Sequence, residues 1–246
     1  MINALRPSYD LHIHSCLSPC ADDDMTPANI AGMAHLNGLD FLALTDHNST
    51  DNLPAFFECC RAFGIVPIAG IEVTTSEDIH LVVLFKRLHE ALEFGKIIKS
   101  SLMPITNNPE IFGNQFAVDS DDNVIFEEKT LLITATSLSV SDVISIASSY
   151  GAVVYPAHID RQSNGMAAIL GDIPKEYGFK VIELNDRANK EDSIIKYHLE
   201  GAKFVYSSDA HHLWDINEAV NRVTLIREAS GSEDEMRELF FSSILL

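Results

Sequence analysis

Seven short apolar runs, separated by amphipathic segments, restrict the fold of this chain more than any other feature. They are rich in Val, Ile, Leu and Phe and lack a clean polar alternation, which is typical of strands covered on both faces. The runs are Tyr9–Ile13, Asp40–Leu44, Val66–Ile71, Ile79–Phe85, Ala152–Pro156, Lys180–Leu184 and Lys203–Ser207. Such strands, alternating with helices along the whole chain, predict an α/β fold with a parallel sheet or barrel.

Helix start and stop signals lie between the runs. Thr26 followed by Pro27 marks a helix start, and Gly38 follows the end of that helix. One stretch, residues 107–135, breaks the alternation, and we interpret it as a hairpin with strands Gln115–Val118 and Val124–Glu127. We expect this hairpin to be an excursion from a single domain, residues 1–246.

The composition restricts the partners. The 17 Lys and Arg against 36 Asp and Glu give a net charge of −19, which disfavours long nucleic acid because binding it depends on basic side chains. A small phosphorylated substrate fits better. No run approaches the ~18 apolar residues of a membrane span, and the start of the chain lacks a secretion signal, so we expect a cytoplasmic protein.

The four cysteines, Cys16, Cys20, Cys59 and Cys60, are then expected to be reduced. We interpret Cys59 and Cys60 as buried small hydrophobic residues. A structural role is also favoured for Cys16 and Cys20, although they flank the first histidine motif, so a redox or ligand role stays open.

Metal-competent side chains recur at the ends of the predicted strands. His12 and His14 are two residues apart on an extended segment, so both imidazoles point to one face. The further candidates are Asp46, His47, Glu72, His80, His158, Asp209 and His211. His80 is an exception because it opens its strand. The strand C-termini of a parallel barrel meet at one mouth, and imidazole with carboxylate suits zinc, iron or manganese. The sequence therefore predicts a divalent metal site.

In this order, the motifs resemble the PHP family, named for the polymerase and histidinol phosphatase proteins that share it. The matching motifs are His12-x-His14, Thr45-Asp46-His47, Gly70-Ile71-Glu72, His80, Pro156-Ala157-His158 and Ser208-Asp209-Ala210-His211. The resemblance covers essentially the whole chain. It implies a distorted seven-stranded (β/α)7 barrel, which agrees with the number of apolar runs.

The resemblance also implies two or three divalent ions. The implied ligand sets are His12, His14, Glu72 and Asp209 for the first ion, Glu72, His80 and His158 for the second, and His47, His211 and a loop residue for the third. Counting back from Thr26–Pro27 selects Asp22 as that loop residue, with Asp23 or Asp24 as alternatives. The loop after His14 is longer than the family pattern.

The function that this site predicts is hydrolysis of a small phosphomonoester, a phosphorylated metabolite or a nucleotide, by a metal-activated hydroxide. Glu72 and Asp209 would act through the metals, and Arg161 is a candidate to contact the phosphate, with a surface ion pair as its alternative. An exonuclease or phosphodiesterase that acts on oligonucleotide ends is the second hypothesis. A non-catalytic metal-binding module and a carbon–nitrogen hydrolase are weaker ones. The substrate, the metals and the oligomeric state stay open.

Overall fold

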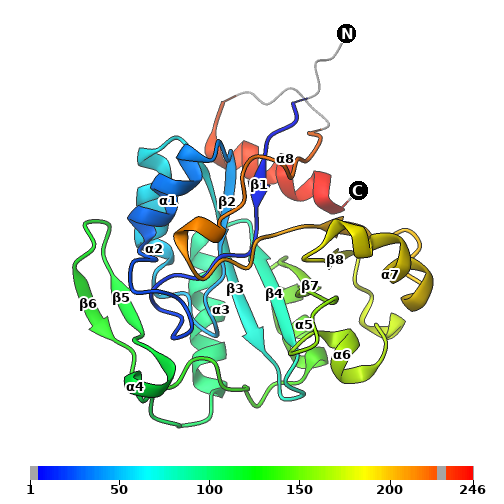
Figure 1. Ribbon diagram of the computed structural model, residues 1–246, viewed down its shortest axis with the longest axis horizontal. Coiled ribbons are helices and arrows are strands. Elements are labelled where there is room, and N and C mark those ends of the chain that lie inside the picture. The colour runs from blue at the N-terminus through cyan, green and yellow to red at the C-terminus, as the bar shows by residue number, and fades with distance from the viewer. Residues whose placement is uncertain (1–4, 226–230, 246) are drawn as a thin grey trace.

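A computed structural model describes residues 5–225 and 231–245 as an α/β fold (Figure 1). The strands are β1 (Tyr9–Asp10), β2 (Phe41–Leu44), β3 (Val66–Thr74), β4 (His80–Phe85), β5 (Phe116–Val118), β6 (Val124–Glu127), β7 (Val153–Pro156), β8 (Val181–Glu183) and β9 (Lys203–Val205). The helices are α1 (Pro27–Leu36), α2 (Leu53–Ala62), α3 (Leu88–Ser101), α4 (Pro109–Phe112), α5 (Val140–Ser149), α6 (Met166–Leu170), α7 (Lys190–Tyr197) and α8 (Glu233–Leu245), with 3-10 turns η1 (Lys175–Tyr177), η2 (Arg187–Asn189) and η3 (Leu213–Asp215).

The main sheet has the strand order β1-β2-β3-β4-β7. β1, β2 and β3 are parallel, but β4 runs antiparallel to both β3 and β7, so the expectation of an all-parallel sheet is wrong for this strand. The turn between Thr74 and His80 is too short for a helical crossover, and only an antiparallel strand can follow it. Because Thr74 pairs with His80, the start of β4 lies beside the end of β3.

A continuous seven-stranded barrel is not confirmed in the described part of the chain. β8 and β9 form a separate parallel pair. One isolated bridge, between Ile13 and Ala210, and one hydrogen bond, from Ile159 N to Glu183 O at 3.1 Å, connect this pair to the neighbouring strands. β1 has two residues and β8 and β9 have three each, which is too short to close a hydrogen-bonded ring.

Alternation along the strands separates two apolar cores. Ile68 of β3 and Val82 and Leu84 of β4 belong to the core inside the curl of the sheet, where α8 adds Phe240. The intervening residues on these strands pack outward against α1, α2, α3 and α5. Arg237 of α8 donates to the carbonyls of Pro67 and Lys86. Helix α8 therefore closes the curl at the end where β3 begins.

Gly70 faces the inside of the curl between Ile68 and Glu72, two residues from each. A Cβ atom at this position would lie 2.7 Å from Thr45 Cγ2 and 2.9 Å from the Leu44 carbonyl oxygen. Both contacts are shorter than van der Waals separations. Only glycine therefore allows β2 and β3 to approach this closely.

Residues 107–135 leave the sheet where the sequence predicts a hairpin, and β5 and β6 pair antiparallel there. The base of this segment is fastened to the loop after β1, because Phe116 N donates to Cys16 O at 2.9 Å. Val124 and Ile125 of β6 are exposed.

No helix in residues 5–225 and 231–245 is both long and apolar enough to cross a membrane.

Candidate metal centre

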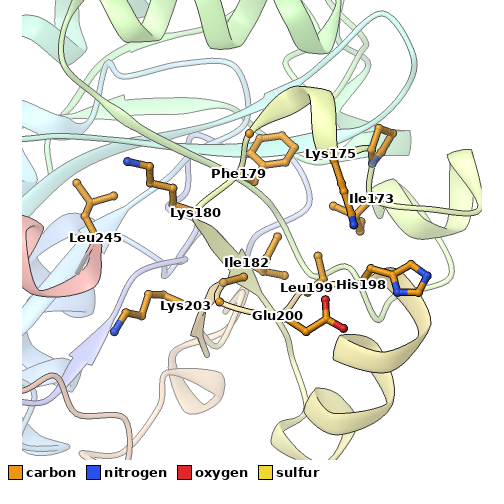
Figure 2. Close-up of a pocket in the computed structure, with 14 residues that line it drawn as sticks. Ile173, Lys175, Phe179, Lys180, Ile182, His198, Leu199, Glu200, Lys203 and Leu245 are labelled. Carbon is orange, nitrogen blue, oxygen red and sulfur yellow. The ribbon is translucent and has the colours of Figure 1, made fainter.

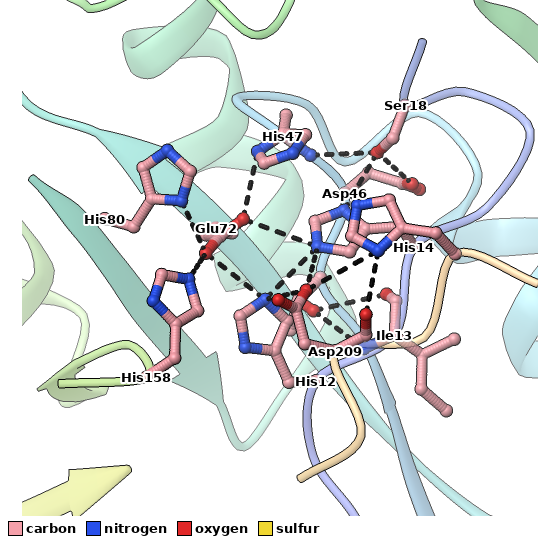
Figure 3. Close-up of polar contacts among 12 residues, drawn as sticks. His12, Ile13, His14, Ser18, Asp46, His47, Glu72, His80, His158 and Asp209 are labelled. Atoms are coloured by element: carbon pink, nitrogen blue, oxygen red, sulfur yellow. Dashed lines mark hydrogen bonds and ion pairs between the residues drawn. The ribbon is translucent and has the colours of Figure 1, made fainter. Parts of the chain in front are cut away.

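Eight predicted ligand side chains converge at the open end of the curl, opposite α8. They come from the segment after β1, the end of β2, β3, the start of β4, the end of β7 and the segment after β9. Figure 3 shows the rings and carboxylates of seven of them, all except His211, pointing toward one another. They are His12, His14, His47, Glu72, His80, His158, Asp209 and His211. His80 joins them because β4 is antiparallel and begins at this end.

Glu72 is the centre of the group, and its side chain is buried. A ring nitrogen of each of five histidines lies within 3.4 Å of one of its carboxylate oxygens (Figure 3). The separations are 3.3 Å for His12, 3.4 Å for His14, 2.9 Å for His47, 2.9 Å for His80 and 3.2 Å for His158. A carboxylate in this position can bridge two cations.

Asp209 supplies the second buried carboxylate. Its Oδ1 lies 3.3 Å from His12 Nε2 and 3.1 Å from His14 Nε2, and its Oδ2 pairs with the guanidinium of Arg161. Asp209 has φ 53° and His158 has φ 29°. Non-glycine residues rarely adopt the left-handed region, and such conformations concentrate at functional sites.

The donor atoms fall into three groups in which every pair of ligand atoms lies within 4.8 Å. The groups are His12, His14 and Asp209; His47, Glu72 and His80; and His14, His47 and His211. His14 and His47 are shared between groups. The three groups therefore lie side by side, at a spacing that suits a cluster of ions.

The directions of the pKa shifts of His14 and Glu72 suit metal binding. Burial, together with the neighbouring His47 and His211, keeps the pKa of His14 well below its usual value, so its imidazole is neutral. Burial alone would raise the pKa of Glu72, but His80, His12 and His47 hold it well below its usual range. Neutral imidazoles and ionised carboxylates are the forms that bind divalent metals.

Several of these polar atoms are buried without a hydrogen bond. His47 Nδ1 and Glu72 Oε2 lie 2.9 Å apart, yet neither makes a hydrogen bond of acceptable geometry, and His158 Nδ1 has none either. Burying such atoms without partners is costly. A bound cation would satisfy the free lone pairs, so the residues present fit the divalent ions that the sequence predicts.

Glu183 supports the group and was missed by the sequence reasoning. This buried carboxylate lies 2.9 Å from His12 Nδ1 and accepts the backbone N–H of His158 at 3.1 Å. A carboxylate behind a ligand histidine fixes its orientation and tautomer. The signal was present, because alternation along β8 puts Val181 and Glu183 on the same face, and an acid inside a buried strand calls for a partner.

Asp46 also acts behind the ligands, through Ser18. Its carboxylate accepts from Ser18 Oγ at 2.7 Å and from Ser15 N at 2.7 Å. Ser18 Oγ in turn lies 3.1 Å from His14 Nδ1 and accepts from His47 N at 3.1 Å. This chain of contacts suits a carboxylate that orients the ligands His14 and His47 and does not itself bind a metal.

The structure does not bring the predicted loop ligand Asp22 into any of the three groups. The backbone N–H of Asp22 donates to His211 O at 3.0 Å, but its carboxylate accepts a hydrogen bond from His212 Nδ1 at 2.7 Å. Asp23 accepts from Asn114 Nδ2 instead. The longer loop therefore turns its acids toward the rim.

A cavity of about 580 Å³ lies elsewhere, at the starts of β8 and β9 (Figure 2). Lys175, Lys180 and Lys203 lie along it, over a floor that includes Ile182 and Leu199. Its lining contains no histidine–carboxylate group of the kind seen around Glu72. The clustered donors, and not the size of the hollow, therefore locate the candidate site.

Comparisons with known proteins agree with this geometry. Residues 10–187, more than half of the chain, match the model of the PHP domain. A 5'-3' exoribonuclease from Haemophilus influenzae is 33% identical over 89 residues, which are 35% of this chain and 31% of that protein. The chain therefore spans about a third of the length of this curated relative.

Solved structures share the fold. An endonuclease, PfuEndoQ from Pyrococcus furiosus, superposes with a TM-score of 0.61 at 18% identity, over 95% of this chain and 55% of that one. A Bifidobacterium adolescentis protein described as a metal-dependent phosphoesterase gives a TM-score of 0.57 at 17% identity, over 97% of each chain. These identities show similarity of fold alone.

The fold and the clustered donors define an α/β protein with a candidate centre for divalent metal ions. The chain belongs to the PHP domain family.

Proposed function

We propose that this protein hydrolyses the phosphate ester of a small phosphorylated substrate and that it works with two or three divalent metal ions. One observation carries the proposal: the Glu72 carboxylate lies within 3.4 Å of a ring nitrogen of five histidines. Such a cluster of imidazoles around buried carboxylates is the donor set for zinc, manganese or iron.

The clustered side chains would divide into ligand sets for two or three ions. His12, His14 and Asp209 would hold one ion, while Glu72 would join that ion to a second one near His47, His80 and His158. His211, with His14 and His47, offers a third position. When bound, the ions would neutralise charge on the phosphoryl oxygens and make a water molecule acidic enough to act as the nucleophile.

Arg161 is the residue that we propose for phosphate contact. Its side chain is 44% exposed, while the Asp209 carboxylate that it pairs with is buried, so the guanidinium reaches into the site from its rim. An arginine can hold two phosphate oxygens with parallel hydrogen bonds. The competing role is that of an ion pair that only fixes Asp209.

The size of the substrate is the least constrained part of the proposal. The net charge of −19 favours a small substrate over a long polyanion. The partial match to a 5'-3' exoribonuclease supports cleavage at oligonucleotide ends as the second candidate. A cytoplasmic location and a single-domain organisation stay predictions.

A phosphate-release screen tests the proposal. Phosphomonoesters, diesters and short oligonucleotides would be compared with Zn²⁺, Mn²⁺ and Fe²⁺, before and after removal of metal with a chelator. We expect release from small monoesters that chelation abolishes and added metal restores. Diesters and oligonucleotides yield monoesters and no inorganic phosphate, so their products would be separated by chromatography. Cleavage of these substrates alone would favour the nuclease, and no hydrolysis of any ester would contradict both candidates.

A further inference from the structure

An exposed aromatic pair lies on the segment that follows His211. Trp214, the only tryptophan of the chain, is 73% exposed. Its ring stacks on that of His212, with centroids 4.8 Å apart and planes inclined by 5°. Tryptophan is enriched at binding interfaces because its large ring combines an apolar face with a hydrogen-bond donor.

Hydrogen bonds fix the pair at the rim of the metal centre. Asp22 bonds one member of the pair and the residue before it: its carboxylate accepts from His212 Nδ1 at 2.7 Å, and its N–H donates to His211 O at 3.0 Å. His211 is itself one of the clustered ligands. Three residues can span at most about 11 Å, so Trp214 lies within that distance of His211 along the backbone. Asp22 is thus a positioning residue for the aromatic pair.

We propose that Trp214 and His212 form a stacking platform for the base of a nucleotide whose phosphate occupies the metal centre. The inference rests on the proposed function and specifies its substrate class. A flat indole with one face open and its other face covered by a parallel ring suits a flat heterocycle, because every base offers a π-face to an aromatic side chain. A single nucleotide carries base and phosphate close enough together to reach both places.

The charge of the rim favours a short substrate. Asp22, Asp23 and Asp215 lie on the two segments that form the platform, and all three are exposed. A long strand would need basic side chains along its backbone, and these segments, residues 21–24 and 211–217, contain neither Lys nor Arg. The platform is therefore suited to one base, next to the phosphate that is removed.

The single tryptophan provides a direct test. Adenosine 5'-monophosphate, ribose 5-phosphate and inorganic phosphate would each be mixed rapidly with the metal-loaded protein, and Trp214 fluorescence followed before turnover. We expect saturable quenching by the nucleotide and none by the two probes without a base. Equal responses to all three, or no response to the nucleotide, would overturn the platform.

Variants supply a second measurement. Trp214→Ala should reduce the ratio of kcat/KM for adenosine 5'-monophosphate to that for ribose 5-phosphate by roughly tenfold or more, and Trp214→Phe should retain most of the ratio. Phe126→Ala, which removes a ring that is 41% exposed on β6, is the matched control and should leave the ratio unchanged. An unchanged ratio in Trp214→Ala would refute the platform.

The failures of the two proposals are distinguishable. If neither ester is hydrolysed, the phosphoesterase proposal fails, while quenching by the nucleotide would still support base binding. If both are hydrolysed equally well and Trp214 fluorescence does not change, the platform is wrong and the phosphoesterase stands. Light scattering that shows a dimer of the wild type and a monomer of Trp214→Ala would identify a protein contact instead, and would also overturn the platform.

Discussion

The two ends of the curled sheet are built by the same strands and yet have opposite chemistry. Near α8, Ile68 and Leu84 pack with Phe240 in an apolar core whose members are buried. Four residues further along the same inner face, Glu72 and His80 belong to a cluster of polar atoms, some of them without hydrogen bonds. The first end stabilises the fold, whereas the second end costs stability until cations bind. Substitutions at the two ends should therefore affect different measurements.

The largest effect is expected for Glu72→Gln. The neutral amide cannot bridge cations, so we expect bound metal to be lost and phosphate release to fall more than about 100-fold, beyond the effect typical of residues behind the ligands. The melting temperature of the metal-free protein should also fall, because the surrounding histidines hold the pKa of Glu72 below its usual range and so stabilise its ionised form in the fold. Metal analysis, turnover and calorimetry measure the three quantities.

Glu93→Gln, on the exposed face of α3, is the matched control and should change none of them. Wild-type turnover together with wild-type metal content in Glu72→Gln would show that the carboxylate is not central to the site.

At the apolar end, Phe240→Ala should lower the free energy of unfolding by about 3–5 kcal/mol. In the wild type the Phe240 ring is fully buried and stacks on Phe41 with centroids 4.6 Å apart. Its removal would leave a cavity in the apolar core. Denaturant titration measures the loss. Metal content per folded molecule should stay at the wild-type level, and a parallel loss of metal would mean that the two ends are not separable.

Glu183→Gln should show an intermediate effect. Without the charge behind His12, we expect metal affinity to fall about 10–100-fold, with the fold intact. A metal-competition titration measures this change. Glu176→Gln, an exposed glutamate in η1, is the control. Unaltered affinity in Glu183→Gln would indicate that His12 is held in place by packing alone.

The smallest effect is expected at a surface ion pair far from both ends. Lys99 Nζ lies 2.5 Å from Glu128 and 3.1 Å from Asp51, and Lys99→Met should cost at most about 1 kcal/mol. Burial would raise the pKa of Glu128, but Lys99 and the backbone of Thr130 hold it below its usual value. A depressed carboxyl pKa stabilises the fold above the usual range of that group.

This stabilisation is lost as the pH falls through the lowered pKa. The difference in unfolding free energy between wild type and Lys99→Met should therefore shrink between neutral and acid pH. A difference that grows on acidification would contradict the assigned direction.

Much of the candidate site could be predicted because it lies at strand ends. Glu72 and His158 lie just after apolar runs that the sequence predicts as strands. The order of the motifs along the chain already indicated the family. The direction of β4 was missed because hydrophobic patterning does not encode strand polarity. The signal lay in the short gap between the runs Val66–Ile71 and Ile79–Phe85, which leaves no room for a helical crossover. The pairing of Asp22 with His212 also escaped prediction, because it depends on the conformation of a loop with three consecutive acids.

Gly70 has a consequence for anyone who wishes to retune this enzyme. The spacing between β2 and β3 is set by an absent side chain, and any larger residue would push Thr45 and Leu44 aside. Such a displacement would carry Asp46 and His47, the next two residues, away from Glu72. Position 70 therefore does not tolerate a larger side chain. New substrate preferences would have to be engineered elsewhere, for example in the loops at the rim of the site.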